Sequence, residues 1–280
     1  MGIIIGIDIG GSNTKIVGIK GDTILSPIQV RATDPIASLY GAFGKYLSEN
    51  KIQLSDVERV MITGVGASGV EKPIYGIRTF KVDEFQSVGL GGLYLSKLKK
   101  AVIVSMGTGT AYVIADGNKV THLGGTGVGG GTLLGLSKKM INVGKFDDII
   151  NMAATGDLSM VDLSIKDITK ERVSTLTPDV TASNFGKISD LATKNDLALG
   201  IINLVFQTIG MLAVFATKIT GDSNVVLTGF LTVVPQTEVI FNQLESMFDI
   251  KFIVPEHAEY ATAIGAALSY NIENNYKEII

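Results

Sequence analysis

Residues 3–17 read Ile3-Ile4-Ile5-Gly6-Ile7-Asp8-Ile9-Gly10-Gly11-Ser12-Asn13-Thr14-Lys15-Ile16-Val17, and this stretch decides the fold. Its first half is a nearly continuous run of β-branched residues, which is typical of a strand buried on both faces. Two glycines then turn the chain, and a second apolar run begins at Ile16. Glycines let backbone N–H groups approach a phosphate closely, and Ser12, Thr14 and Lys15 add donors. The residues leave two interpretations open, a phosphate-binding turn and an ordinary Gly-Gly hairpin.

Asp8 interrupts the first apolar run near its end. Carboxylates commonly hold Mg²⁺, directly or through water, beside nucleotide phosphates. The position therefore suits a magnesium site if the turn binds phosphate.

Composition indicates a globular chain and argues against several functions. The 280 residues are enough for one large domain or two lobes, and 46% are apolar against 18% charged. The net charge is −3 with only four arginines, so no basic stripe favours nucleic-acid binding. The absence of cysteine excludes disulfides, thiolate zinc sites, cysteine-bound iron–sulfur clusters and a thiol nucleophile.

Residues 197–217 carry no formal charge over 21 positions, a length that could span a bilayer. Asn203, Gln207 and Thr208 interrupt the run, and no aromatic belt flanks it. We therefore predict a helix buried at the centre of a domain or in a dimer interface.

The order of elements at the start recurs from Ala101. A strand over 101–105, a turn over 106–110, a strand over 111–115, a hairpin turn at Asp116-Gly117 and a strand over 119–123 are predicted. Two such turns that faced each other could hold one polyphosphate from both sides. A chance repeat of two hairpins is the alternative.

Two further glycine clusters punctuate the second half. Residues 124–132 contain six glycines and lead into a helix predicted over 133–141, which indicates an anion site at a helix N-terminus. A buried strand over 224–228 ends at Gly229, a corner where a flat base could lie on the backbone. Helices are predicted over 181–193, 197–219 and 258–271.

Taken in order, these elements resemble the actin-like ATPase superfamily. The resemblance implies an α/β fold of two lobes, in which a βββαβα unit of the ribonuclease H type is duplicated, one copy in each lobe, with ATP in the cleft between them. It implies an N-terminal lobe of residues 1–99 plus a C-terminal helix 258–280, and a C-terminal lobe of residues 100–257 with the nucleotide and dimer helices.

Three stretches resemble the type II (eukaryotic-like) pantothenate kinases more narrowly. They are residues 6–12 with Lys15, residues 82–85 before Gly91, and residues 129–136. Residues 177–186 and 256–266 add support.

This resemblance implies a cytoplasmic, homodimeric kinase that uses ATP and Mg²⁺ to convert pantothenate to 4'-phosphopantothenate, the first step of coenzyme A biosynthesis. It leaves feedback by coenzyme A or acyl-CoA open, and implies no nucleic-acid or membrane partner. Two alternatives remain. One is another small-molecule kinase of the superfamily, for a sugar or a pantetheine-like acceptor. The other is a non-kinase ATPase of the actin or chaperone type.

Carried onto this sequence, the resemblance makes Glu84 the catalytic base and Asp8 the magnesium residue. A carboxylate suits deprotonation of a primary hydroxyl, although a glutamate that begins a helix is also favoured by the helix dipole. The substrate contacts would be His122, Gly125 and Thr126. The nucleotide would be contacted by Gly10, Gly11, Ser12, Asn13, Thr14, Lys15, Thr108, Gly109, Thr110, Gly130, Gly131, Thr132, Phe146 and Gly229.

His122 departs from the family pattern, which places an arginine there. An arginine is always charged and presents a planar fork, whereas a histidine is largely uncharged near neutral pH. The resemblance therefore leaves the acceptor open, and His122→Arg is expected to tighten pantothenate binding if His122 faces the substrate. A surface histidine at a strand end is the alternative.

Overall fold

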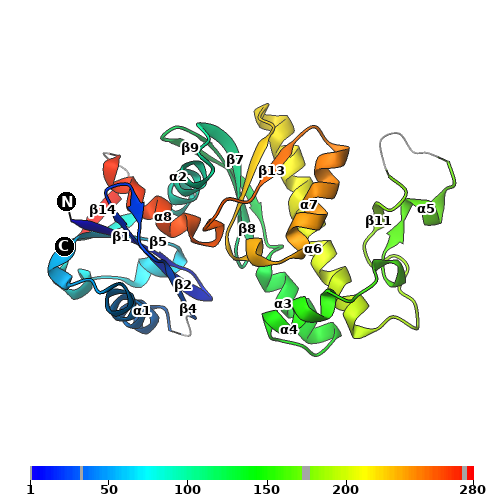
Figure 1. Cartoon of the computed structure of the whole chain (residues 1–280), viewed down its shortest axis with the longest axis horizontal. Helices are drawn as coiled ribbons and strands as arrows, with labels where there is room; N and C mark the ends of the chain where they lie inside the picture. The colour runs from blue at the N-terminus through cyan, green and yellow to red at the C-terminus, as the bar shows by residue number, and fades with distance from the viewer. Residues whose placement is uncertain (1, 32–33, 172–176, 273–275) are drawn as a thin grey trace.

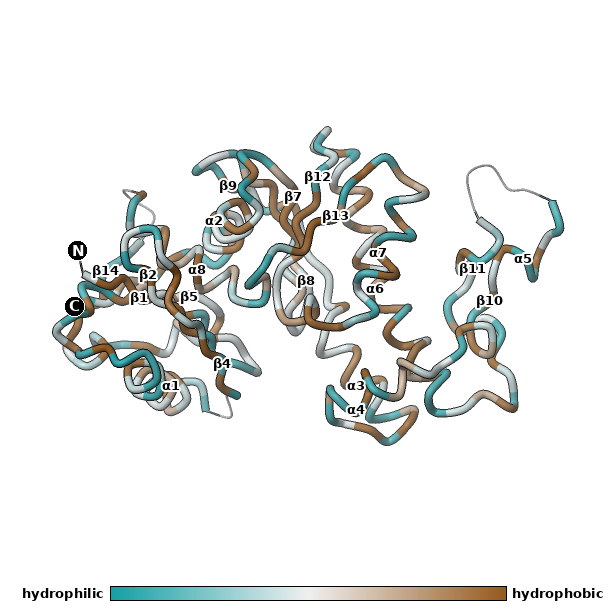
Figure 2. The backbone as a smooth tube through the Cα atoms, in the orientation of Figure 1, coloured by the Kyte–Doolittle hydropathy of each residue, from teal (hydrophilic) through white to brown (hydrophobic). Residues whose placement is uncertain are grey.

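The computed structural model describes residues 2–31, 34–171, 177–272 and 276–280. Two sheets, one on each side of a central helix pair, dominate the arrangement (Figure 1). Both chain termini lie in the lobe of the first sheet. Figure 2 shows hydrophobic residues in brown along strands of both sheets, such as β2 and β7, and alternating colours along the helices.

The first sheet has seven strands in the order β14-β6-β5-β1-β2-β3, with β4 also paired to β2. Their bounds are β1 Ile3–Ile9, β2 Asn13–Lys20, β3 Thr23–Ile24, β4 Ile28–Arg31, β5 Val57–Thr63, β6 Thr79–Val82 and β14 Tyr276–Ile279. The predicted strand buried on both faces is confirmed, because Ile5, Ile7 and Ile9 have no exposed surface and Ile4 packs into a separate cluster. After β2 the chain forms two short strands, β3 and β4, on either side of Pro27, which lacks the N–H that a ladder needs.

The second sheet has five strands in the order β13-β12-β7-β8-β9. Their bounds are β7 Lys100–Met106, β8 Thr110–Asp116, β9 Lys119–Thr126, β12 Asn224–Thr228 and β13 Lys251–Ile253. The meander β7-β8-β9 repeats the start of the first sheet, as predicted. A mixed α/β fold of two lobes is thus confirmed.

Helices cover the sheets and link them. Their bounds are α1 Pro35–Asn50, α2 Glu84–Ser96, α3 Gly130–Met140, α4 Phe146–Ala153, α5 Ile165–Ile168, α6 Lys194–Thr220, α7 Gln236–Met247 and α8 Ala261–Leu268. Helix α8 packs on the first sheet and α2 on the second, and the two helices pack against each other. The lobe boundary at residue 99 stays a prediction.

Helix α6 runs for 27 residues through the second lobe. By length and composition it could cross a membrane, but 61% of its most apolar window is buried inside the protein. It belongs to the largest core cluster, with β7, β12 and α7. A capping box at its start, in which Thr193 and Asp196 exchange hydrogen bonds, fixes where it begins. The predicted buried core helix is confirmed.

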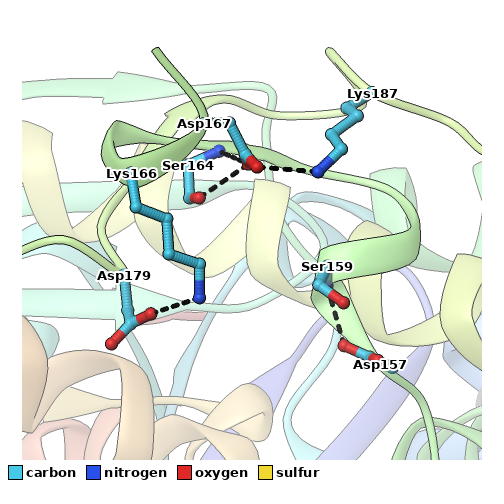
Figure 3. A network of polar contacts seen from close by, with 7 residues as sticks. All are labelled: Asp157, Ser159, Ser164, Lys166, Asp167, Asp179 and Lys187. Atoms are coloured by element: carbon cyan, nitrogen blue, oxygen red, sulfur yellow. Dashed lines mark hydrogen bonds and ion pairs between the residues drawn. The ribbon is translucent and has the colours of Figure 1, made fainter. Parts of the chain in front are cut away.

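Residues 157–171 and 177–187 project from the second lobe and carry α5 and the two-stranded sheet of β10 (Leu163–Ser164) and β11 (Thr181–Ser183) (Figure 1). Figure 3 shows their surface ion pairs, Lys166 to Asp179 at 2.6 Å and Lys187 to Asp167 at 2.7 Å. The helix predicted over 181–193 is wrong. Thr181, Asn184 and Phe185 donate hydrogen bonds to the buried carboxylate of Asp162, which holds this chain in an extended and turned conformation.

Candidate active site

A cavity of about 680 Å³ opens between the lobes, within the range of small-ligand sites. The turn after β1 and the turn after β7 both line it, so the prediction that the two turns face one shared cleft is confirmed. The predicted site residues on its wall are Asp8, Gly10, Gly11, Ser12, Asn13, Lys15, Glu84, Thr108, Gly109, Thr110, His122, Gly125, Thr126, Gly130, Phe146 and Gly229.

Asp8 and Lys15 lie directly opposite each other, on β1 and β2. Lys15 is only 8% exposed. Burial raises the pKa of Asp8, while the charge of Lys15 lowers it. Burial lowers the pKa of Lys15, while the carboxylates of Asp8 and Glu259 raise it. A buried ammonium beside a carboxylate at a cavity wall is a suitable receptor for a phosphate chain.

Gly64, the residue that follows β5, packs closely against Asp8. A Cβ built at Gly64 would lie 2.6 Å from Oδ1 of Asp8, and the residue has a φ of 88° that favours glycine. The next residue, Val65, is 69% exposed and lines the cavity. The Gly64-Val65-Gly66 sequence after a strand could have indicated that this turn forms part of the site.

The predicted anion site at the N-terminus of α3 stays a prediction, because two of the amides there have partners inside the protein. The amides of Gly130 and Gly131, at the start of α3, donate to the carbonyl oxygens of Gly107 and Thr108 at 2.9 Å each. These donors are used inside the protein, so they are not free for a phosphate. The glycines instead permit close backbone packing, because a Cβ at Gly129 would lie 2.6 Å from the Thr108 oxygen. The run thereby braces the second turn against α3.

Three predicted nucleotide residues do not line the cavity. Thr14 is fully buried, and its Oγ1 has no hydrogen-bond partner among the described residues. The amide of Gly131 is bonded to the second turn, and Thr132 Oγ1 donates to Gly127 O at 2.9 Å. Their predicted contact with nucleotide stays a prediction.

Glu84 begins α2 and faces the cavity. Asp83 caps the helix by accepting a hydrogen bond from the amide of Gln86 at 2.9 Å. The protein atoms that keep water from the Glu84 carboxylate raise its pKa, and the charges of Asp8 and Asp83 raise it further. A carboxylate with a raised pKa in a cleft is a common feature of general bases.

Two aromatic pairs line the cavity from opposite faces of the second sheet. Phe146 of α4 and Phe230, which follows β12, have ring centroids 4.7 Å apart, on the face covered by α6. Phe85 of α2 and His122 of β9 stack with centroids 3.8 Å apart, on the other face. The first pair fits the predicted aromatic beside a nucleotide base. The second pair adjoins Glu84.

Eight residues that line the cavity were not predicted from the sequence. Four of them directly adjoin predicted residues, such as Phe85 after Glu84 and Phe230 after Gly229. The eight are Val65, Phe85, Ser105, Gly107, Ala111, Leu134, Phe230 and Thr262.

Among the described residues, no group of three or more His, Cys, Asp or Glu side chains could hold a metal ion. Mg²⁺ in phosphoryl-transfer sites is commonly held by one or two carboxylates together with substrate phosphates and water. The single carboxylate of Asp8, in the cavity wall opposite Lys15, fits that kind of site.

Two lobes with repeated β-meanders, each contributing a turn to one cleft, define an actin-like ATPase fold. The model of the Fumble family matches residues 100–269, more than half of the chain. The chain therefore belongs to the Fumble family, that of the type II pantothenate kinases. The predicted family is confirmed.

The chain is similar to curated type II pantothenate kinases over most of its length. That of Oceanobacillus iheyensis is 30% identical over 213 residues, which are 73% of this chain and 80% of the relative. That of Bacillus cereus is 26% identical over 241 residues, which are 80% of this chain and 82% of the relative.

Solved structures of similar fold include two proteins with bound nucleotide analogues. The activator of 2-hydroxyisocaproyl-CoA dehydratase from Clostridium difficile, with bound ADPNP, has a TM-score of 0.68 and 20% identity, and the match covers 95% of this chain and 93% of that one. A ROK family glucokinase from Streptomyces griseus, in complex with glucose and AMPPNP, has a TM-score of 0.60 and 14% identity, with 95% and 98% covered. At these identities the likeness supports the fold alone.

Proposed function

We propose that this protein is a pantothenate kinase, which transfers the γ-phosphoryl group of ATP to the primary hydroxyl of pantothenate. The observation that carries the proposal is the cavity itself. A carboxylate with a raised pKa, Glu84, shares its wall with two phosphate-type turns in a chain of the type II pantothenate kinase family.

Each part of the wall has a role in this reaction. Glu84 accepts the proton of the acceptor hydroxyl, and Lys15 offers positive charge to the phosphate chain from the first lobe. Thr108, Gly109 and Thr110 approach the phosphates from the second lobe. Phe146 and Gly229 lie beside the nucleotide base of ATP. His122, Gly125 and Thr126 contact the acceptor. Mg²⁺, held by Asp8, would supply charge neutralisation at the phosphates.

We also propose that the enzyme is a cytoplasmic homodimer. Leu212, Phe215 and Ile219 of α6 are 36%, 50% and 80% exposed, on a helix whose other side lies in the core. An exposed apolar row on a core helix supports a subunit contact there. Feedback by coenzyme A or acyl-CoA is an open part of the proposal.

The direct test measures ADP release by the purified protein with pantothenate, pantetheine, glucose, an amino sugar or no acceptor. We expect release that depends on pantothenate. Release with pantetheine or a sugar but not with pantothenate would favour another small-molecule kinase, and release without any acceptor would favour a non-kinase ATPase.

The acid side of the pH–activity profile should report Glu84. A general base must be ionised, and the pKa of Glu84 is raised above 4.5, the usual value for a glutamate, because the cleft keeps water from it and Asp8 is near. We therefore expect kcat/KM to fall as the pH decreases through a value above 4.5. Rate measurements in buffers of constant ionic strength, with folding followed by circular dichroism, test this. A decline only below 4.5 would contradict it.

A further inference from the structure

One buried hydroxyl behind the cavity wall has no partner in the described part of the chain. Thr63, the last residue of β5, has no exposed surface, and its Oγ1 makes no hydrogen bond among the described residues. Buried hydroxyls are nearly always hydrogen-bonded, because a buried donor without a partner raises the free energy of the folded state. Packing alone therefore does not explain why a threonine stands here.

The register of the first sheet places Thr63 beside Asp8. Asp8 pairs with Thr63 on β5 and with Lys15 on β2. Residues that pair across neighbouring strands point to the same face of a sheet. The three side chains therefore form one row, Lys15–Asp8–Thr63. The first two line the cavity, and Thr63 is the fully buried end of the row.

This row lies on the face of the sheet that α8 covers. Met61, two residues before Thr63, packs in the same cluster as Ala263 of α8. Gly6, two residues before Asp8, approaches the same helix, since a Cβ there would overlap the carbonyl oxygen of Ala263. Alternate residues of a strand share a face. Thr63 and Asp8 are thus on the covered face, where a hydroxyl has few possible partners.

The carboxylate of Asp8 lies over the end of β5. A Cβ built at Gly64, the residue after Thr63, would lie 2.6 Å from Oδ1 of Asp8. One carboxylate oxygen is therefore close to the backbone that carries the Thr63 hydroxyl. A carboxylate accepts several hydrogen bonds, and one from a buried donor fixes which oxygen stays turned toward the cleft.

From this row we propose that Thr63 is a positioning residue for Asp8, whose hydroxyl donates to the Asp8 carboxylate when that carboxylate holds Mg²⁺ beside the nucleotide. Carboxylates that bind a metal are commonly oriented by a further hydrogen bond, and loss of such a partner typically lowers metal affinity by about 10–100-fold. The inference rests on the proposed function, in which Asp8 holds the metal.

The test measures how much Mg²⁺ strengthens the binding of the ATP analogue AMPPNP. Isothermal titration calorimetry gives the Kd of AMPPNP in EDTA and in excess Mg²⁺, and the ratio of the two values reports the metal site. In Thr63→Val, which keeps the shape of the side chain and loses the hydroxyl, we expect this ratio to fall about tenfold. The Kd in EDTA should not change. Thr63→Ser keeps the hydroxyl and should retain the wild-type ratio.

Ser137→Ala is the matched control. Ser137 of α3 is also fully buried, its Oγ has no partner among the described residues, and it lies outside the cavity wall. We expect the wild-type ratio in this variant. Loss of an unpartnered hydroxyl should leave the urea midpoint of both Ser137→Ala and Thr63→Val equal to or above that of the wild type. A role of Thr63 in folding alone would lower the midpoint and would weaken AMPPNP binding in EDTA as well.

The outcomes separate this inference from the proposed function. The titration contains no acceptor, so it decides the role of Thr63 whether or not pantothenate is phosphorylated, and absence of pantothenate-dependent ADP release contradicts the proposed function by itself. An equal ratio in the wild type and Thr63→Val would overturn the role of Thr63, and so would a ratio in Thr63→Ser as low as that in Thr63→Val. If Thr63→Val does not fold, Thr63→Ala removes the same hydroxyl and is compared in the same way.

Discussion

Replacing Glu84 by glutamine is expected to lower kcat for pantothenate-dependent ADP release by about 10²-fold or more, the usual range for removal of a general base. The substitution keeps the size of the side chain and its place at the start of α2, but it removes the group that would accept the hydroxyl proton. The KM for ATP should change little, because the phosphate-binding turns are untouched.

Stability distinguishes this loss from misfolding. The raised pKa of Glu84 means that the folded state binds its proton more tightly than the unfolded chain does. Such a group stabilises the fold at low pH, and this contribution is lost as the pH rises through the folded-state pKa. At neutral pH the ionised carboxylate is therefore unfavourable, and Glu84→Gln should unfold at an equal or higher urea concentration than the wild type.

Glu49→Gln is the matched control for charge. Glu49 lies on α1, where its side chain is 52% exposed and forms only a surface pair with Lys45. We expect unchanged kcat in this variant. A Glu84→Gln enzyme with nearly full activity would remove Glu84 from the role of base and leave it as a helix-start residue.

The parts of the fold that could be predicted from the sequence are those that depend only on residues close together in the chain. The β1–β2 and β7–β8 hairpins are marked by apolar runs that stop at glycines, so their pairing needs only neighbouring residues. Their convergence on one cavity followed from the repeat of the pattern.

The helix wrongly expected over 181–193 shows what local patterns lack. Asp162 lies about twenty residues before Thr181 and Asn184, and its buried carboxylate is what makes their extended conformation favourable. No propensity within 181–193 reports such a partner.

Prediction of the site was limited in the same way, because a local pattern does not report partners that are distant in the sequence. A glycine before a helix can offer its amide to a ligand or pack tightly on another turn, and the residue type does not distinguish the two. The structure shows the second use at Gly130 and Gly131. Val65 and Phe85 reach the cavity through the way α2 and the turn after β5 are placed by the two sheets, which is a tertiary property.

The crossing of α2 and α8 is the place where a single methyl group should cost the most stability. A Cβ built at Gly265 would overlap the carbonyl oxygen of Ser87, and one at Gly91 would overlap that of Ala261. Backbone atoms cannot move aside as a flexible side chain can. Since α8 packs on the first sheet and α2 on the second, separating them also moves Glu84 away from Asp8.

Gly265→Ala is therefore expected to lower the free energy of unfolding by about 1–3 kcal/mol, the usual cost of overpacking, and to lower kcat as well. Urea denaturation followed by circular dichroism measures the first effect, and ADP release the second. Gly44→Ala is the control, because Gly44 lies in helix α1 and a Cβ there would meet nothing within 4 Å. Alanine in an open helical position should stabilise by up to about 1 kcal/mol. The two variants should thus change stability in opposite directions, and a change of the same sign in both would mean that the close contact of α2 with α8 does not hold the lobes in place.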